Sequence, residues 1–445
     1  MEKWFRGIFA GGGIALLVLA LVWGMSKLIG PSRMERAALA TMSEPVQFTG
    51  RNAYPAIWLM DYPVPAAEMD SVMAEDVRRV ADAPLQTPDG KFSVSTVVAA
   101  GRFQSDQPDQ AARVRLCKPS EDCLAKVRGD LTGFGKWVDQ HAAWFARAEL
   151  ATHADQLRNP FPPRVDMPLP SFVSVYAPAT QLALRFAQGD REAAISSTCQ
   201  LMVDWRTLGA NTDMLIAWAV ARGYGAEGYG KLLAQMLAEM PVDQPLPAEC
   251  RDALTPPAAA EISMCAAMRG EFNHISRTMA SMMEIESRKN GFKQKVFFDA
   301  DMTKAMTAVP MAKYCAEETN AAFAADKTPD QAEEPGMYRL QCVSNAIGCI
   351  LSRIAAPGYQ GFELGHRDGL AMKRALAALA WWRNQPDGLS DPAATLARMP
   401  AEYRAAAHPL RLNEDKTALI LPRLQDKKEE MVLPLPGTRI PAITR

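Results

Sequence analysis

The stretch FVSVYAPATQLALRFAQGDREAAISSTCQLMVDWRTLGANTDMLIAWAVARGYGAEGYGKLLAQMLAE, residues 172–239, decides the fold class. It contains three apolar runs with helical spacing, which are separated at Gly189-Asp190 and at Gly209-Ala210-Asn211. Glycine just after a helix and Asp, Asn or Thr just before the next one are stop and start signals. Connections this short place consecutive helices side by side in opposite directions. The stretch therefore predicts antiparallel helical hairpins.

Apolar residues keep a helical spacing on both sides of this stretch, and prolines divide the chain there into separate helical segments. Residues 159–170 contain five prolines, which rule out a continuous helix there because proline lacks the backbone N–H that a helix interior needs. Residues 241–257 form a second proline-rich connection, and residues 52–65 are expected to be extended. We expect further helices at residues 67–81, 123–158, 258–289, 296–325, 338–355 and 370–384.

Three short apolar runs follow near the C-terminus, at residues 410–412, 418–421 and 431–435. Charged residues separate them, which is typical of a small antiparallel β-element. The predicted fold class is thus mainly α: antiparallel helical hairpins or a bundle, with this β-element near the C-terminus and one transmembrane helix in front.

A charge-free run, IFAGGGIALLVLALVWGMS, occupies residues 8–26. As a helix it would span roughly 28 Å, close to the thickness of the hydrocarbon core of a bilayer. A cleavable signal peptide is the alternative, because Lys3 and Arg6 precede the run. The run is longer than a usual signal core, and the nearest A-x-A pattern, Ala38-Leu39-Ala40, follows several charges. We therefore expect a retained single-pass anchor.

The cysteines indicate the compartment, since the basic residues on the two sides of the run do not favour either orientation. There are eight of them, an even number, and all follow residue 116. Such usage is typical of an oxidised extracytoplasmic domain. We predict an inner-membrane protein with a cytoplasmic N-terminus and most of the chain in the periplasm. The expected parts are residues 1–30 (cytoplasmic stub and anchor), 31–66 (stalk and extended segment), 67–369 (helical extracytoplasmic domain) and 370–445 (helix, β-element and tail).

Some disulfide pairings follow from spacing. Cys117 and Cys123 bracket a short polar loop and are expected to pair. Cys342 and Cys349 lie seven residues apart on one predicted helix, about 10 Å along its axis, so each is expected to pair with another element. Cys315 is a natural partner for one of them.

Cys199 has two possible partners, Cys250 in the second proline-rich connection and Cys265 in the helix after it. No C-x-x-C motif is present, so thiol exchange of the thioredoxin type has no support. The metal-ligand pairs of zinc sites are also missing from the sequence.

The bulk composition excludes one class of partner. The formal net charge is −1, with 48% hydrophobic and 22% charged residues. Non-specific nucleic-acid binding needs clustered basic charge, so we expect none.

Residues 189–273 resemble a group of uncharacterised membrane-anchored helical proteins of planctomycetes and proteobacteria. The residues that carry the resemblance are Gly189-Asp190 at a helix start, the long helix after it, and Met268-Arg269-Gly270-Glu271 after a proline break. The C-terminal part is also similar, with ALAALAWWR and then His408-Pro409-Leu410-Arg411. This chain has Gln385-Pro386-Asp387-Gly388 where the group usually has Gly-x-x-Pro. The resemblance implies a fold and no activity.

Candidate site residues are few. The chain has five histidines and no H-E-x-x-H, G-x-S-x-G, Walker or Gly-x-Gly-x-x-Gly motif. Glu271 and His274 lie three residues apart on a predicted helix, as a base and its orienting partner would. Glu363 and His366 are expected in a glycine-flanked loop, FELGHRD, that suits a metal or a ligand.

Methionines offer one more candidate site. The chain has 24, and Met279, Met282 and Met283 lie on one predicted helix. Thioethers select Cu(I), but methionine is also a common filler of hydrophobic cores, which is the interpretation we favour.

The function expected from the sequence is that of a non-catalytic binding or scaffold protein of the cell envelope, with an envelope protein as partner and no cofactor. The alternative is an anchored periplasmic hydrolase or metal-dependent enzyme that uses Glu271, His274, Glu363 and His366. The two hypotheses differ in a testable way, because the enzyme needs these four side chains in one pocket.

Overall fold

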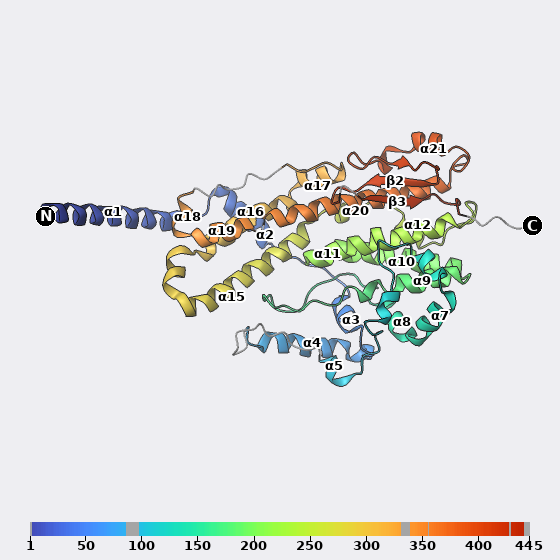
Figure 1. Cartoon of the computed structure of the whole chain (residues 1–445), viewed down its shortest axis with the longest axis horizontal. Coiled ribbons are helices and arrows are strands. Elements are labelled where there is room, and N and C mark those ends of the chain that lie inside the picture. Colours follow the sequence, from blue (N-terminus) through green and yellow to red (C-terminus); the bar gives the residue numbers. More distant parts are fainter. Residues whose placement is uncertain (1, 86–97, 331–338, 355, 427–428, 440–445) are drawn as a thin grey trace, which may run out of the picture.

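Helix α20 (Ala356–Arg383) runs along the length of the molecule, and α11, α12 and α19 pack against it (Figure 1). The structure is a computed structural model that describes residues 2–85, 98–330, 339–354, 356–426 and 429–439, without the side chains of 2–12, 286–295, 356 and 357. Helix α1 (Glu2–Leu28) projects from one end of the body, and the small sheet lies toward the other end. The predicted fold class, mainly α with a C-terminal β-element, is confirmed.

The central helices follow the three runs that the sequence predicts. They are α9 (Pro178–Ala187), α10 (Arg191–Ala210) and a third helix in which α11 (Leu215–Arg222), a π-helix (Gly223–Tyr229) and α12 (Gly230–Ala238) are continuous. Glycines let this third helix approach its neighbours closely. A Cβ at Gly225 would lie 2.9 Å from the Cβ of Trp205, and one at Gly228 would lie 2.6 Å from the Tyr176 ring.

The region before these helices is divided more finely than its periodicity suggests. Asp122 and Asp130 each accept a hydrogen bond from a backbone N–H three residues later, and so start two separate helices. The elements are α4 (Ala66–Asp82), α5 (Ala99–Arg102), a 3-10 turn (Ala112–Arg115), α6 (Cys123–Arg128), α7 (Leu131–Gln140) and α8 (Ala142–Leu150).

The expectation of a stalk and an extended segment at residues 31–66 is wrong. Residues Arg33–Ser43 form α2, which packs against α16, and Tyr54–Leu59 form α3. The Ser32 hydroxyl accepts from the N–H of Glu35, and the Glu35 carboxylate accepts from the N–H of Ser32, which is a capping box. Glu35 is fully buried and forms an ion pair with Arg339 at 2.7 Å, so this segment belongs to the body.

The second half of the chain contains α15 and α20, which are long and separated by shorter helices. The FELGHRD segment is not a loop, since residues 362–368 lie inside α20, which also runs across the expected boundary at residues 369–370. The remaining helices are α13 (Cys250–Ala253), α14 (Ala259–Ile262), α15 (Cys265–Phe297), α16 (Ala300–Ala312), α17 (Glu317–Ala324), α18 (Gln341–Ser344), α19 (Ala346–Ile354) and α21 (Pro392–Arg398), with 3-10 turns at Ser174–Tyr176, Lys313–Cys315 and Ala401–Tyr403.

The predicted β-element is a three-stranded antiparallel sheet in the order β1-β2-β3, formed by Arg411–Leu412, Ala418–Pro422 and Glu430–Pro434. Leu419 is opposite Leu433, and both are buried. They belong to the same hydrophobic core as α9, α10 and α12, so the sheet is packed onto the helical body.

All eight cysteines form disulfides: Cys117–Cys123, Cys199–Cys250, Cys265–Cys315 and Cys342–Cys349. The first pairing is as predicted, and the second is one of the two alternatives for Cys199. The prediction for Cys342 and Cys349 is wrong, because they bond to each other across a corner at Asn345 that separates α18 from α19. That corner shortens their Cα–Cα distance to 5.8 Å.

No single helix within the described residues is long and apolar enough to meet the usual requirement for a membrane span. Residues 13–28 of α1 together with α2 have the length and composition for one within the same described part of the chain, but these two helices are bent by 46° relative to each other.

Candidate functional site

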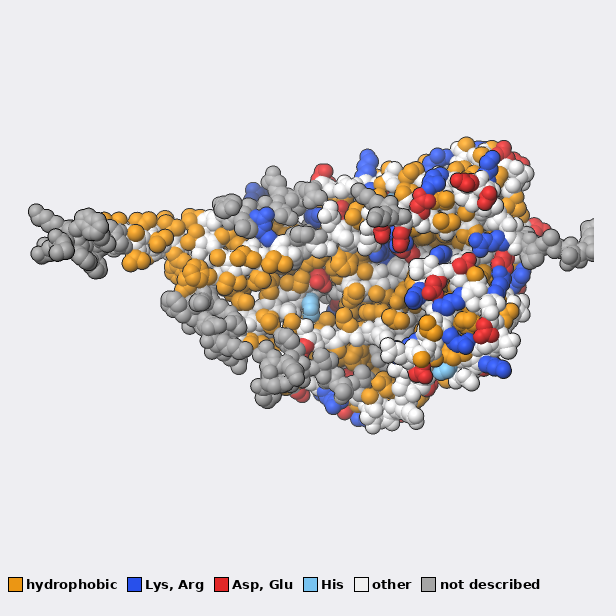
Figure 2. Space-filling view, viewed as in Figure 1, with side chains coloured by type: hydrophobic (Ala, Val, Ile, Leu, Met, Phe, Trp, Pro, Cys, Tyr) orange, Lys and Arg blue, Asp and Glu red, His pale blue; other side chains and the backbone are white. Residues whose placement is uncertain are grey.

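A cleft of about 630 Å³ opens between the first half of α15, the start of α11 and the proline-rich segment after Arg158. Figure 2 shows the body hollowed on the viewed face, where apolar side chains surround a histidine. We call this feature the α15 cleft. Its lining residues are Ser43, Pro45, Val46, Arg158, Asn159, Phe161, Pro163, Met167, Leu169, Asp213, Met214, Leu215, Ile216, Gly270, Glu271, Asn273, His274 and Arg277.

The proline-rich wall of the α15 cleft is held in place by hydrogen bonds and an ion pair with neighbouring segments. Leu157 forms a bridge with Thr212, whose hydroxyl donates to the Leu157 carbonyl at 2.6 Å. Asn52 accepts from the Arg158 N–H at 3.0 Å and donates to the Arg158 carbonyl at 2.9 Å. Buried Arg164 forms an ion pair with Asp166 and donates to carbonyls at the end of α4. These contacts preform one side of the cleft.

The opposite wall depends on a close approach between α15 and the start of α11. A Cβ at Gly270 would lie 1.7 Å from the carbonyl oxygen of Asp213, a distance that no side chain tolerates. Gly270 therefore lets the backbones touch. Asp213 forms an ion pair with Arg158 at 3.0 Å through one carboxylate oxygen, while its Oδ1 is buried without a described hydrogen-bond partner.

Glu271 and His274 both line the α15 cleft, as their spacing on one helix predicts. Burial raises the pKa of the Glu271 carboxyl and lowers the pKa of the His274 imidazole, so both shifts favour the neutral forms. Among the described residues, no hydrogen bond or ion pair joins the two side chains, and His274 Nδ1 is buried without a partner. The cleft is therefore lined by both apolar and polar side chains, and two buried polar atoms of its lining residues, His274 Nδ1 and Asp213 Oδ1, lack partners among the described residues.

Glu363 and His366 lie elsewhere, on α20, with their side chains buried in the interior. The Tyr314 hydroxyl donates to Glu363 at 3.4 Å, and Lys313 lies 3.5 Å from the same carboxylate. His366 Nε2 donates to the carbonyl of Ile262 at 2.7 Å. Burial lowers the pKa of His366 to about 3, so its ring is neutral. Neither residue lines the α15 cleft, so the structure places the four sequence candidates in two separate environments.

The methionine candidates Met279, Met282 and Met283 lie half-buried on α15. Several other methionines of this region are buried in two hydrophobic clusters, which contain Met264, Met268 and Met311, and Met302 and Met306. In the described part of the chain, no group of three or more His, Cys, Asp and Glu side chains is arranged to hold a metal ion.

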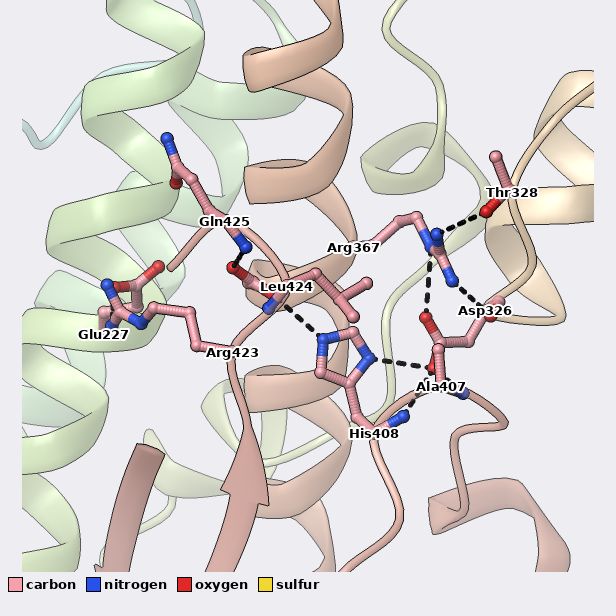
Figure 3. A network of polar contacts seen from close by, with 10 residues as sticks. Glu227, Asp326, Thr328, Arg367, Ala407, His408, Arg423, Leu424 and Gln425 are labelled. Carbon is pink, nitrogen blue, oxygen red and sulfur yellow. Dashed lines mark hydrogen bonds and ion pairs between the residues drawn. The ribbon is translucent and has the colours of Figure 1, made fainter. Parts of the chain in front are cut away.

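A buried polar network that sequence reasoning missed joins the C-terminal segments to the body (Figure 3). His408 lies between two carboxylates, with Nδ1 2.8 Å from Asp326 and Nε2 2.8 Å from Asp368. Arg367 contacts Asp326, and the N–H groups of Leu424 and Gln425 donate to Asp368.

Burial decides the role of this network. The His408 side chain is 0% exposed and the two aspartate side chains are 1% exposed, so no ligand reaches them. The network is structural. One feature of the sequence could have indicated this network. His408 precedes an apolar run, and a charged histidine that is buried beside such a run needs an acidic partner.

No family model, curated protein or solved structure matches this chain. The resemblance to the membrane-anchored planctomycete and proteobacterial group stays a prediction, and the geometry of the α15 cleft is what bears on function.

Proposed function

We propose that this chain is a single-pass inner-membrane protein whose disulfide-bonded periplasmic domain binds an amphiphilic ligand in the α15 cleft. The observation that carries the binding proposal is the pair of buried atoms without partners, His274 Nδ1 and Asp213 Oδ1, on residues that line a cleft with both apolar and polar side chains. Buried polar atoms in folded proteins nearly always have hydrogen-bond partners, so these two mark a place for a ligand's polar group.

The size and lining of the cleft indicate the class of ligand. About 630 Å³ lies within the range of sites for small molecules. Phe161, Met167, Leu169 and Ile216 offer apolar surface, and burial raises the pKa of Glu271 and lowers the pKa of His274, as expected for ionisable groups beside such a surface. Asp213 Oδ1 can only accept, so the ligand's polar group should carry a donor. An acyl chain or apolar ring with a hydrogen-bonding head has this chemistry.

Helix α1 supports the anchor. It is continuous from Glu2 to Leu28, and its large apolar side chains from Ile14 to Met25 are mostly exposed, with Leu16 at 70% and Leu19 at 64%. Apolar surface of this kind is unfavourable in water and favourable in lipid. The four disulfides support an oxidising compartment.

Photocrosslinking tests the binding proposal. The probe is a long-chain alcohol that carries a diazirine, added to the full chain in nanodiscs, with crosslinked residues mapped by mass spectrometry. We expect crosslinks in residues 159–169, 213–216 and 270–277. Leu169→Trp and Ile216→Trp, at partly exposed lining positions, should fill the cleft and remove them.

The matched control is Leu389→Trp, because Leu389 is exposed to a similar extent and lies outside the cleft. It should leave the crosslinks unchanged. Crosslinks confined to α1, or equal in all three variants, would overturn the proposal. Crosslinks that only an apolar peptide displaces would indicate a protein segment as the occupant instead.

Hydrolysis is the alternative function, and the shared position of Glu271 and His274 in one cleft is what favours it. Release of 4-nitrophenol from a 4-nitrophenyl acyl ester, lost in His274→Gln and retained in His366→Gln, would support catalysis over binding alone.

A further inference from the structure

The end of the body from which α1 projects exposes a second apolar surface, distinct from the α15 cleft. Its residues come from the end of α15, from α18 and the residue before it, and from α19: Phe297, Leu340, Val343, Ile350 and Ile354. We call this set the collar. Figure 2 shows apolar side chains continuing from the projecting helix onto this end of the body. Exposed apolar patches on soluble surfaces are usually interaction sites.

One face of α19 packs against the body, and the opposite face exposes two isoleucines among the described residues. Gly348 approaches Thr303 so closely that a Cβ would lie 1.9 Å from the threonine hydroxyl, and Cys349 contacts Met306. Ile350 and Ile354 are four residues apart, so they lie on one face, where they are 52% and 70% exposed. The helix therefore presents an isoleucine stripe outward.

Hydrogen bonds fix the collar to the last turns of α1. The Ser26 hydroxyl donates to the carbonyl of Leu340 at 2.6 Å and accepts from the N–H of Ser344 at 3.0 Å. The indole of Trp23 donates to the carbonyl of Val296, at the end of α15, at 2.7 Å. The collar is thus held beside residues 23–26 of α1.

The position of Trp23 along α1 sets the depth of the collar. From Ile8 to Trp23 a helix rises about 23 Å, less than the ~30 Å of a hydrocarbon core. A bilayer that holds the charge-free run therefore reaches Trp23, a residue type that favours the membrane interface. Elements bonded to α1 at this level lie at the interface too.

We propose that the collar inserts into the interfacial layer of the same phospholipid bilayer that holds α1. The inference rests on the proposed anchoring of α1. A bilayer is the occupant because the collar is continuous with the lipid-exposed surface of α1 and is fixed beside it. The isoleucine stripe then lies in lipid, and the body stands in one orientation with the α15 cleft at a constant height above the membrane.

Depth-dependent fluorescence quenching tests the collar in the full chain. All eight native cysteines are in disulfides, so an added cysteine is the single free thiol for an environment-sensitive label. The label is placed by Ile350→Cys or Ile354→Cys. The protein is reconstituted into phosphatidylethanolamine and phosphatidylglycerol vesicles that contain spin-labelled lipid.

Two further sites are controls. Leu19→Cys reports on the anchor, and Val432→Cys reports on an exposed apolar position of β3, far from α1 in Figure 1. We expect quenching at positions 19, 350 and 354 and little at 432. Quenching at 19 with positions 350 and 354 as unquenched as 432 would overturn the collar and leave the anchor intact. No quenching at 19 would overturn both proposals, and equal quenching at all four sites would overturn the collar.

Discussion

His408 Nε2 lies 2.8 Å from Asp368 Oδ1 in a position without solvent access. The other ring nitrogen faces Asp326, so a protonated ring donates to two carboxylates. Asp326 follows α17, Asp368 lies within α20, and His408 precedes β1. This single side chain therefore connects three segments that are far apart in the sequence.

Replacing His408 with glutamine should destabilise the fold by about 3 kcal/mol, because removal of one partner leaves buried carboxylates uncompensated. Urea unfolding followed by circular dichroism measures the change. His141→Gln is the matched control, since His141 is part-buried and bonds only to the Trp137 carbonyl among the described residues. Equal losses in the two variants would contradict the role of the network.

The stability difference between wild type and His408→Gln should depend on pH. Burial opposes the charged ring, but the bonds to Asp326 and Asp368 outweigh it and raise the pKa of His408 above 6.5. Its stabilisation is therefore complete below pH 6.5 and is lost as the pH rises through the raised value. Burial also opposes the ionised form of both aspartates, but the bonds from His408 and from backbone N–H groups outweigh it and lower their pKa values below 3.8, so their contribution is lost in acid. The difference should be largest between about pH 4 and 6.5, and a difference that grows above pH 7 would be inconsistent with this assignment.

The disulfides should differ in their contribution to stability. Cys199–Cys250 closes a loop with a sequence separation of 51, and Cys117–Cys123 one of 6. Loop-closure entropy predicts losses of about 4 and about 2 kcal/mol for the two double serine variants. Chemical unfolding of each variant gives these values, and a larger loss for the short loop would refute the entropic account.

A thiol count tests the oxidised state itself. An alkylating mass tag applied to the denatured full chain should add nothing before reduction and eight tags after it, because all eight cysteines are paired. Tags that appear without reduction would contradict the periplasmic assignment.

Much of the fold follows from local pattern. The glycine and Asp or Asn signals around residues 189 and 209–211 mark the ends of the central helices, and the three apolar runs near the C-terminus form the sheet. The sequence also places Glu271 and His274 together, because two residues three apart share a helix face.

The incorrect predictions concern segments whose structure depends on contacts between residues that are distant in the sequence. The corner at Asn345 depends on its side chain, which accepts from the N–H of Asp299 and the hydroxyl of Thr303. FELGHRD is helical although glycines flank it, because Gly365 and Gly369 make room for the side chain of Arg222. No local pattern reports such partners. The α15 cleft likewise needs three segments that meet only in the folded chain.

Two glycine-to-alanine substitutions on long helices should have opposite effects. Gly361→Ala in α20 meets no described atom within 4 Å, so better helix propensity should stabilise the protein by up to about 1 kcal/mol. Gly270→Ala drives a Cβ into the carbonyl of Asp213 and should lower the thermal midpoint clearly. Similar midpoints for the two variants would show that the α11–α15 contact is looser than described.

Glu271→Gln should stabilise the protein at pH 7. Burial raises the folded-state pKa of Glu271 above 4.5, so the native state binds this proton more tightly than the unfolded state, and stability is lost as the pH rises from 4.5 through the raised value. Glutamine removes that loss, so its advantage should be present at pH 7 and vanish near pH 4.5 in urea unfolding. Glu249→Gln, at an exposed position, should show no such dependence. Destabilisation by Glu271→Gln at pH 7 would contradict this account. It would indicate that Glu271 is ionised in the folded protein and is stabilised there by a positively charged partner.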